Sequence, residues 1–498
     1  MFFSLSLAAL TVAAIVSAST AQQPFGSQLP IASNAFETYD NGLFSPLEDL
    51  NLLSTDSFTT LTHPVFPKHS VRIKKSSDFC DGTVNAYTGY IDIQARHLFF
   101  YFFESRSNPE TDDVIFWTNG GPGCSSGLGL FMELGPCRID TANATKFNPY
   151  SWNDNANVFF VDQPIGVGFS YADYGETVST TEEAAKDVAV FVAMFFEHFN
   201  KFKGNAFHMA GESYGGRYIP VFASEVYDQN AVLIQNGLTP INLTSVMIGN
   251  GCTDDGTMYS AYYEMQCSPA SVHPINTIAN CVDMRRKVPR CEKMFKESCR
   301  DSTDSIACNI ALSFCNDAIF NPFMETGYNP YDISKPCEGD ISDTLCYPIT
   351  KNISRYLDRP EVRETLGVDP SIGAYQSCSS DVGARFDINL DGVFPTQFYI
   401  AALLERDISV LIYVGASDWI CNWLGNDRMS LGLEWYGKEA FNAQELSEWQ
   451  FNGTAAGLTR SAGPLTFATI YDAGHMVPYD KPEASLEMVK RWLAGESL

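Results

Sequence analysis

The chain has 498 residues, of which 45% are hydrophobic and 18% are charged, and its formal net charge is −27. This hydrophobic content is sufficient for a large buried core and excludes a disordered chain or a repeat protein. The strong negative charge argues against nucleic acid and anionic membranes as partners, because both are negatively charged themselves.

An apolar segment at residues 1–21 is predicted to be a secretory signal peptide. The small residues Ser17-Ala18 and Ser19-Thr20-Ala21 suit cleavage by a signal peptidase, although the segment contains no Lys or Arg. The alternative is an N-terminal helix that is buried in the folded protein. The 14 cysteines favour the first interpretation, because disulfides form in oxidising compartments.

Four Asn-x-Ser/Thr sequons also fit secretion, and they are candidate N-glycosylation sites. Their asparagines are Asn143, Asn242, Asn352 and Asn452. No later apolar segment approaches the ~20 residues that span a bilayer, and the final residues lack an anchor-addition tail. We therefore expect a secreted protein without a membrane anchor, with a vacuolar or lysosome-like compartment as the second choice.

Residues 22–75 form a polar stretch that ends in the basic group Arg72, Lys74 and Lys75. We interpret this stretch as an N-terminal extension. It is either a propeptide that is removed or an ordered segment that stays, and the sequence leaves both possibilities open.

From residue 76 onwards, predicted strands and helices alternate. Strand-like apolar runs occupy residues 87–93, 98–103, 114–117, 158–161, 207–210 and 245–248. Helical spacing of apolar residues is found at 180–199, and a second helix pattern follows Ser213. This alternation predicts an α/β fold, with residues 76–251 as the first part of its core.

Residues 252 to about 348 are rich in cysteine and charge and contain no long apolar strand. We interpret residues 252–350 as an inserted cap that is stabilised by disulfides. Strand patterns return at 410–414 and 467–471, and a last helix follows, so residues 351–498 are predicted to complete the core.

The segment Gly211-Glu212-Ser213-Tyr214-Gly215 has the pattern G-x-S-x-G and lies between a predicted strand and a predicted helix. At such a sharp turn a serine hydroxyl stands clear of the sheet, and the flanking glycines relieve crowding. We therefore interpret Ser213 as a catalytic nucleophile. A purely structural turn is the alternative.

A serine hydroxyl needs a general base, and in hydrolases with this turn the chain order is Ser, then Asp or Glu, then His. Only His273 and His475 follow Ser213. His273 lies in the predicted cap, whereas His475 follows the last predicted strand, where catalytic groups collect. A packing histidine is the alternative for His475. Asp418 follows the preceding strand and is the predicted orienting acid.

The glycine-rich loop at residues 119–126 comes directly after the strand at 114–117. A loop of this kind lets backbone N–H groups approach a substrate closely, as an oxyanion hole requires. The predicted donors are the backbone N–H groups of Gly121 and Tyr214. A phosphate-binding loop is excluded, because no Lys follows the glycines in the required position.

Five segments stand in a recognisable order: Asn119-Gly120-Gly121-Pro122-Gly123-Cys124-Ser125-Ser126, Glu133-Leu134-Gly135-Pro136, Gly211-Glu212-Ser213-Tyr214-Gly215-Gly216, Gly249-Asn250-Gly251 and Gly474-His475-Met476-Val477-Pro478. Together they resemble the serine carboxypeptidase family, and its fungal secreted and vacuolar members look closest. The resemblance runs from about Thr88 to Leu493. It implies an α/β-hydrolase fold, with a mixed, mostly parallel sheet, helices on both faces and a disulfide-rich cap insertion.

The resemblance implies that Asn119, Gly120, Glu133 and Glu212 bind the terminal carboxylate of a substrate. Two ionised carboxylates would repel that group. A crowded pair of carboxyls retains a shared proton, however, and a protonated carboxyl donates a hydrogen bond. Activity is therefore expected to be highest at acidic pH.

A substrate pocket is implied in the same way. Its members are Cys252, Tyr259, Tyr262, Met476 and Tyr214. Asp254 and Asp255 lie nearby in the sequence, which raises the hypothesis that they favour a basic residue before the cleaved bond.

The resemblance also implies a disulfide from Cys124 to the cap, with Cys337 as its partner, and an unpaired thiol at Cys421. Cys80 and Cys137 have no counterpart in a vacuolar family member and are expected to pair with each other. With 14 cysteines, one free thiol leaves an odd number, so an assignment needs revision or a second thiol is free.

These expectations define a secreted serine carboxypeptidase that releases C-terminal residues through an acyl-enzyme on Ser213. An acyltransferase or esterase with the same triad, and a non-catalytic binding protein of the same fold, are the alternatives. The expected partners are peptide or protein C-termini, and the expected state is a monomer or homodimer. No His/Cys spacing suggests zinc, so no metal or other cofactor is expected.

Overall fold

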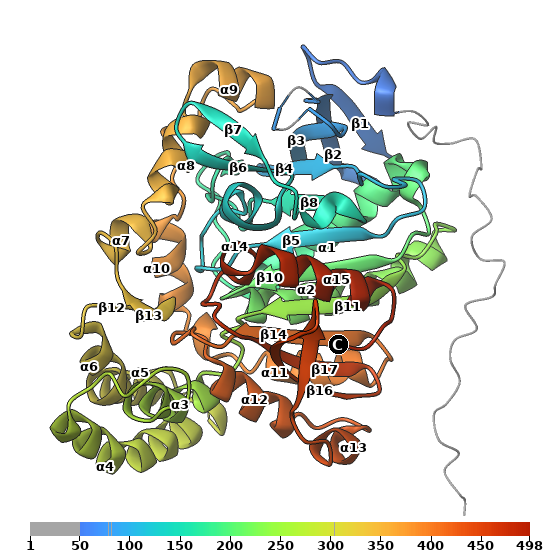
Figure 1. Cartoon of the computed structure of the whole chain (residues 1–498). Helices are drawn as coiled ribbons and strands as arrows, with labels where there is room; N and C mark the ends of the chain where they lie inside the picture. Colours follow the sequence, from blue (N-terminus) through green and yellow to red (C-terminus); the bar gives the residue numbers. More distant parts are fainter. Residues whose placement is uncertain (1–49, 78, 81, 303) are drawn as a thin grey trace, which may run out of the picture. The chain divides into compact units, whose positions relative to one another are not determined.

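Thirteen strands form one mixed sheet in the computed structural model, which describes residues 50–77, 79–80, 82–302 and 304–498 (Figure 1). In spatial order these strands are β1 (Thr59–His63), β2 (Phe66–Lys75), β3 (Ala86–Ile93), β4 (Arg96–Phe103), β8 (Asn157–Val161), β5 (Val114–Thr118), β10 (Phe207–Glu212), β11 (Leu243–Gly249), β14 (Ser409–Gly415), β17 (Leu465–Ile470), β16 (Thr454–Ala462) and β15 (Ser447–Phe451), while the short β9 (Tyr171–Ala172) pairs with β4.

The six central strands β8, β5, β10, β11, β14 and β17 run parallel to one another. The strands at both ends of the sheet are antiparallel. Parallel neighbours end at the same edge of a sheet, and the loops beyond those carboxyl ends are where ligands and catalytic groups gather. The sheet is therefore mixed and mostly parallel at its centre, as predicted.

Helices cover both faces of this sheet. Alternate residues of β4 belong to two separate hydrophobic clusters, with Phe100 and Phe102 in one and Phe99 and Tyr101 in the other. The first cluster includes residues of α1 (Thr181–His198), α2 (Gly215–Gln235), α10 (Ser380–Ile388) and α11 (Gln397–Leu404), and the second those of α8 (Ile349–Leu357), α9 (Pro360–Leu366) and α15 (Pro482–Leu493). Burial on both faces explains the continuous apolar run at 98–103, and the predicted fold class is confirmed.

The remaining elements outside the cap are short. They are the helices α12 (Trp423–Gly432), α13 (Lys438–Asn442) and α14 (Val477–Asp480), the hairpin of β6 (Cys137–Thr141) and β7 (Ala144–Phe147), and the single turns η1 (Leu50–Leu52), η2 (Gly129–Leu134), η3 (Trp152–Asp154), η4 (Asn200–Phe202) and η7 (Asp391–Val393).

The segment predicted as the cap is mostly helical and has its own hydrophobic cluster. Its elements are α3 (Asp255–Cys267), α4 (Ile278–Phe295), η5 (Lys296–Arg300), α5 (Ser305–Cys315), η6 (Asn316–Phe320), α6 (Asn321–Met324), β12 (Tyr328–Asn329), β13 (Asp332–Pro336) and α7 (Ile341–Thr344). Figure 1 shows α3, α4, α5 and α6 gathered at the lower left, away from the strands of the large sheet. Trp419 of the core joins the cap cluster and links the two parts.

Residues 59–75 form β1 and β2, although the sequence analysis placed them in an N-terminal extension. β2 pairs with β3 along seven residue pairs, from His69↔Ile93 to Lys75↔Tyr87. This part of the extension therefore belongs to the sheet. The predicted signal peptide at 1–21 and the extension residues 22–49 lie outside the described residues.

All 14 cysteines are paired in seven disulfides. They are Cys80–Cys137, Cys124–Cys378, Cys252–Cys421, Cys267–Cys281, Cys291–Cys315, Cys299–Cys308 and Cys337–Cys346. The last four lie within the cap, and Cys80 is bonded to Cys137 as expected.

Two expectations about cysteines were wrong. Cys124 is bonded to Cys378 and not to Cys337, because an antiparallel bridge sets Cys124 and Cys378 side by side. Cys337 pairs instead with Cys346 in the same short segment. Cys421 is not a free thiol, because it is bonded to Cys252. No unpaired cysteine therefore remains, and the odd number that a single free thiol would have left does not arise.

Gly89 of β3 offers a test of whether β2 is an integral strand. A Cβ on Gly89 would lie 1.9 Å from the backbone oxygen of Arg72, so Gly89→Ala must separate β2 from β3. We expect a loss of about 1–3 kcal/mol in the free energy of unfolding, as overpacking typically causes. Thermal unfolding measures this. The matched control is Gly432→Ala, which meets no atom within 4 Å and is expected to be neutral. Equal stability of the two variants would contradict the pairing.

Candidate active site

Ser213 stands at the sharp turn between β10 and α2. Its φ of 64° lies in the left-handed region, which is uncommon for a residue other than glycine. Three backbone hydrogen bonds hold this conformation. Ser213 N donates to Gly249 O at 3.1 Å, and Gly216 N and Cys252 N each donate to Ser213 O at 2.9 Å. The turn is thus tied to the end of the neighbouring strand β11.

Asp418 and His475 form a direct hydrogen-bonded pair. His475 Nδ1 lies 2.8 Å from Asp418 Oδ2, and the two residues are 2% and 0% exposed, respectively. Asp418 Oδ1 accepts a further hydrogen bond from Ile420 N at 3.1 Å. This carboxylate is therefore held in one orientation. It favours the tautomer with the proton on Nδ1, which leaves Nε2 as the proton acceptor.

Asn250 received no individual role in the sequence analysis, although it lies between two glycines directly after β11. Its Nδ2 donates to Asp418 Oδ2 at 2.8 Å and approaches Gly474 O at 3.4 Å. Its Oδ1 accepts from Gly415 N at 3.2 Å. One buried amide therefore joins the strand beside the nucleophile turn to the loops that carry the acid and the histidine.

The cap also contributes to this region, which sequence reasoning missed. In the turn between β12 and β13, Tyr331 O accepts from His475 N at 2.7 Å. Pro330 O accepts from Trp419 N and Ile420 N at 3.1 and 3.0 Å. The Tyr331 ring lies 5.1 Å from the His475 ring. The cap hairpin thus holds the acid loop and the histidine loop against each other.

The sheet brings the predicted triad residues to one edge. β10, β11, β14 and β17 are consecutive parallel neighbours. Ser213, Asn250, Asp418 and His475 follow these four strands in that order. Asp418 contacts His475 directly, and the Ser213 turn reaches the pair through β11 and Asn250.

The loop at residues 119–126 packs directly on the nucleophile turn. A Cβ on Gly120 would lie 2.3 Å from Tyr214 N and 2.9 Å from Ser213 Cβ, so only glycine fits there. Gly121 follows with a φ of 113°, which also favours glycine. The predicted oxyanion donors, Gly121 N and Tyr214 N, therefore belong to two segments in contact.

Asp162 anchors the far end of this loop. Its Oδ1 accepts hydrogen bonds from Ser125 Oγ at 2.5 Å and Ser126 N at 3.1 Å. Burial raises the pKa of Asp162 to about 6. Ser126 in turn accepts a hydrogen bond from Asn119 N at 3.3 Å, so the anchor also holds the first residue of the loop.

Asn119 connects the loop to the two predicted carboxyl groups. Its Nδ2 lies 3.4 Å from Glu133 Oε1 and 3.4 Å from Glu212 Oε1. Its Oδ1 accepts from Trp117 Nε1 and from Gly129 N, both at 2.9 Å. These two donors fix the orientation of the amide, so that its N–H groups must face the carboxyl pair.

Glu133 and Glu212 form a buried pair of carboxyls whose pKa values are both raised. Burial is the main cause that raises the pKa of Glu133 and raises that of Glu212 well above its usual range. The charge of Glu133 is the second cause for Glu212. Among the described residues, no amide, hydroxyl or basic group donates to Oε2 of either residue. The raised pKa values favour the protonated form of the pair, and a protonated carboxyl can donate to an anion.

The predicted pocket residues lie around the acid loop. Tyr262 OH donates to Ile420 O at 2.7 Å, and its ring stacks on Trp419 at 4.5 Å. Tyr259 is buried beside Tyr262, with 5.8 Å between the ring centres. Cys252 is half-buried and is bonded to Cys421, so this pocket position carries a disulfide. Met476, next to the histidine, is also buried.

The hypothesis that Asp254 and Asp255 attract a basic side chain loses its basis. Asp255 Oδ1 pairs with Arg217 at 2.8 Å, and Asp254 Oδ1 pairs with Arg300. Both carboxylates therefore already have a positively charged partner within the protein.

Among the described residues, one group of side chains has the spacing of metal ligands, but its chemistry does not suit a metal ion. Asp418, Cys421 and His475 place ligand atoms within 4.8 Å of one another. The sulfur of Cys421 is bound in a disulfide, so it offers no thiolate. The other two groups bind each other.

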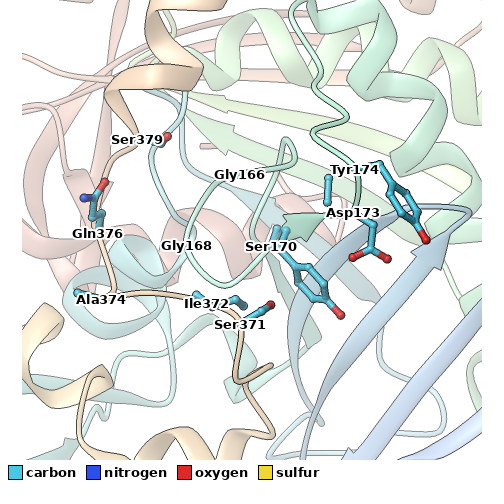
Figure 2. Close-up of a pocket in the computed structure, with 12 residues that line it drawn as sticks. Gly166, Gly168, Ser170, Asp173, Tyr174, Ser371, Ile372, Ala374, Gln376 and Ser379 are labelled. Atoms are coloured by element: carbon cyan, nitrogen blue, oxygen red, sulfur yellow. The ribbon is translucent and has the colours of Figure 1, made fainter.

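Two open cavities, of about 520 and 540 Å³, lie outside the triad. Figure 2 shows the first, where two segments, 166–174 and 371–379, face each other. It borders the loop at 119–126, because Ser379 N donates to Gly123 O at 2.8 Å. The second lies where the central strands begin, opposite the edge with the triad, and includes His208 and Ser409.

Comparison with known families decides the identity of this arrangement. A family model described as serine carboxypeptidase matches residues 79–495. The chain belongs to the serine carboxypeptidase family. Its enzyme class, a serine-type carboxypeptidase, follows from this membership.

Several relatives in this family resemble most of the chain. A vacuolar serine-type carboxypeptidase of Saccharomyces cerevisiae is 44% identical over 443 residues, which cover 88% of this chain and 85% of the relative. Carboxypeptidase Y of Candida albicans is 42% identical over 439 residues, covering 88% and 78%. Carboxypeptidase Y homolog A of Aspergillus oryzae is 43% identical over 438 residues, covering 86% and 78%.

A solved structure supports the fold. The prohormone-processing carboxypeptidase Kex1 of Saccharomyces cerevisiae superposes with a TM-score of 0.72. It is 24% identical, and the match covers 89% of this chain and 97% of that structure. The α/β-hydrolase fold implied by the sequence resemblance is thereby confirmed.

Asn250 provides a test of how the carboxypeptidase site is held together. Asn250→Ala removes the amide donor from the buried Asp418 carboxylate, and a hydrogen bond to a charged group contributes about 1.5–3 kcal/mol. We expect kcat/KM on an N-blocked dipeptide to fall about 10- to 150-fold. The matched control is Asn236→Ala, whose amide donates only within its own helix end. An Asn250→Ala enzyme with unchanged kcat/KM would show that the hydrogen bond from Asn250 to Asp418 is not needed for the reaction.

Proposed function

We propose that this carboxypeptidase is a secreted enzyme that releases single C-terminal residues through an acyl-enzyme on Ser213 and is most active at acidic pH. The observation that carries the proposal is the buried pair of Glu133 and Glu212 beside the Asn119 amide, because Glu212 immediately precedes Ser213. A carboxypeptidase must recognise a terminal carboxylate next to its nucleophile. An esterase or an enzyme that cuts within a chain has no such requirement.

The reaction begins with attack of Ser213 Oγ on the last peptide carbonyl, while His475 Nε2 accepts the hydroxyl proton. Asp418 stabilises the imidazolium that forms, and the N–H groups of Gly121 and Tyr214 stabilise the oxyanion. His475 then protonates the leaving amine, the C–N bond breaks, and Ser213 is left as an ester. A water molecule that gives its proton to His475 hydrolyses this ester and restores the serine.

The terminal carboxylate of the substrate binds beside this chemistry. Its partners are Asn119 Nδ2, Gly120 N and the protonated carboxyl of the glutamate pair. Asn119 has its N–H groups directed to this place by its fixed amide orientation. Because the pair is buried, a hydrogen bond donated to an anion there is stronger than one in water.

The proposal for the compartment rests on the disulfides and sequons. Seven disulfides fit an oxidising environment. Asn143, Asn242 and Asn452 are exposed, whereas Asn352 is half-buried and its Nδ2 donates to Asp140 O at 2.8 Å. The first three are the favoured glycosylation sites. Within the described part of the chain, none of the helices has the length and apolar character needed to cross a membrane.

The glutamate pair predicts a pH dependence of substrate binding. Burial raises both pKa values, so the shared proton persists above the usual range of Glu and is lost as the pH rises further. Loss of the proton turns the donor into a repulsive charge, so KM for an N-blocked dipeptide rises with pH. The folded state binds more protons than the unfolded state in this window, so stability also falls as the pH rises.

Glu212→Gln should flatten this KM profile, because an amide donates a hydrogen bond at every pH. A substrate with a C-terminal amide serves as the control, since it carries no carboxylate. Wild-type activity that stays flat from about pH 4 to pH 9 would contradict the proposal, because the pair must titrate within the range in which carboxyl pKa values are raised by burial.

Ser213→Ala tests the nucleophile. We expect kcat to fall about 10⁴-fold or more, as for other serine hydrolases that lose this hydroxyl. A fluorophosphonate should label the wild type once and the variant not at all. Ser224→Ala is the control, because Ser224 Oγ only donates to Pro220 O within α2. Labelling of the Ser213→Ala variant would show that the nucleophile is elsewhere. Release of a free amino acid from the dipeptide separates peptidase from pure esterase activity.

A further inference from the structure

One disulfide joins two loops of the site that lie far apart in the sequence. Cys252 follows β11 and Cys421 follows β14, and the two are 169 positions apart in the sequence. The four disulfides within the cap close much shorter segments, of 9 to 24 residues. Among the seven disulfides, this one connects the loop that contacts the Ser213 turn with the loop that carries Asp418.

On the nucleophile side, the backbone of Cys252 contacts the serine directly. Cys252 N donates to Ser213 O at 2.9 Å, and this bond is one of three that hold the left-handed conformation of Ser213. A shift of Cys252 would therefore move the carbonyl of the nucleophile itself. The disulfide fixes the position from which this hydrogen bond is made.

On the other side, Cys421 lies three residues after Asp418 and is fully buried. Its sulfur, one carboxylate oxygen of Asp418 and one ring nitrogen of His475 lie within 4.8 Å of one another. Ile420, the residue before Cys421, donates its N–H to Asp418 Oδ1 at 3.1 Å. The disulfide therefore also fixes the loop that orients the acid.

The disulfide and Asn250 both connect the loop after β11 with the loop after β14. The ladder between β11 and β14 ends at Gly249↔Tyr413, before any of the functional residues. Beyond that point Asn250 N still donates to Tyr413 O at 2.8 Å, and the Asn250 amide accepts from Gly415 N and donates to Asp418 Oδ2. The Cys252–Cys421 bond is the covalent connection between the two loops. Loops without a ladder are free to move apart, so each connection restrains the distance between the serine and the acid.

We propose that the Cys252–Cys421 disulfide is a positioning element of the catalytic triad, which holds the nucleophile turn and the acid–base loop in register. The proposal rests on the proposed function of Ser213, Asp418 and His475. A disulfide that acted only as a cross-link would stabilise the fold by limiting the unfolded chain and would leave reaction rates in the folded enzyme unchanged.

The test compares two pairs of substitutions in the full chain. Cys252→Ala/Cys421→Ala removes the proposed element, and Cys267→Ala/Cys281→Ala removes a cap disulfide as the matched control. Two rates are measured well below the thermal midpoint: kcat on an N-blocked dipeptide and the rate of fluorophosphonate labelling of Ser213. Labelling needs no peptide binding, so it reports the arrangement of the reacting groups alone.

We expect both rates of the first variant to fall by the same factor, about 10- to 100-fold. This corresponds to an increase of about 1.4–2.8 kcal/mol in the activation barrier. The control is expected to keep both rates within about twofold while its thermal midpoint falls. Unchanged rates in the first variant, or equal losses in both, would overturn the proposal. A wild type that is labelled but releases no C-terminal residue would instead contradict the proposed function.

A second measurement applies if the alanine pair does not fold. The wild type is treated with dithiothreitol, which gives two electrons and two protons to a disulfide and becomes a cyclic disulfide itself, and the freed thiols are alkylated and mapped by mass spectrometry. We expect activity to be lost in proportion to cleavage of Cys252–Cys421. Full activity in molecules with this bond reduced would overturn the proposal.

Discussion

The buried carboxylate of Asp418 is the constraint around which the rest of the site is arranged. A charge that is removed from water must be compensated by hydrogen bonds, or the folded state loses stability. Asp418 receives three donors, from His475, Asn250 and the backbone of Ile420. Each donor comes from a different loop or position at the sheet edge. The electrostatic need of one side chain therefore brings together the segments that the reaction requires.

The buried carboxyls of Glu133 and Glu212 lie in the opposite kind of environment. Glu133 and Glu212 receive one shared amide, from Asn119, and otherwise no compensating donors among the residues described. Burial raises the pKa values of both glutamates, and the negative charges of Glu133 and Asp418 raise that of Glu212 further. Asp418 thus pairs with the histidine, whereas burial raises the pKa values of the two glutamates. Two neighbouring environments give the same chemical group two different roles.

Local patterns carried most of what could be predicted from the sequence. The run at 98–103 is buried on both faces, and continuous apolarity is the signature of such a strand. The positions of Ser213, Asp418 and His475 after strands follow from chain order and from the parallel topology. The charges of β2 were misleading, because Arg72 forms a two-bond ion pair with Asp92 on the next strand and so fits within the sheet.

Long-range contacts could not be read in this way. The disulfide partners of Cys124 and Cys421 depend on which loops meet in space, and spacing along the chain does not determine that. The backbone oxygens of Pro330 and Tyr331 hold the acid and histidine loops, and a carbonyl gives no signal in side-chain sequence. Asn250 was visible as a polar residue between glycines, but its role appears only with the neighbouring strands in place.

The most direct test is a crystal structure of the enzyme after reaction with a fluorophosphonate. We expect phosphorus bonded to Ser213 Oγ, a phosphonyl oxygen within hydrogen-bond reach of Gly121 N and Tyr214 N, and His475 Nε2 about 3 Å from Ser213 Oγ. An adduct on another residue, or a His475 ring turned away from Ser213, would contradict this expectation.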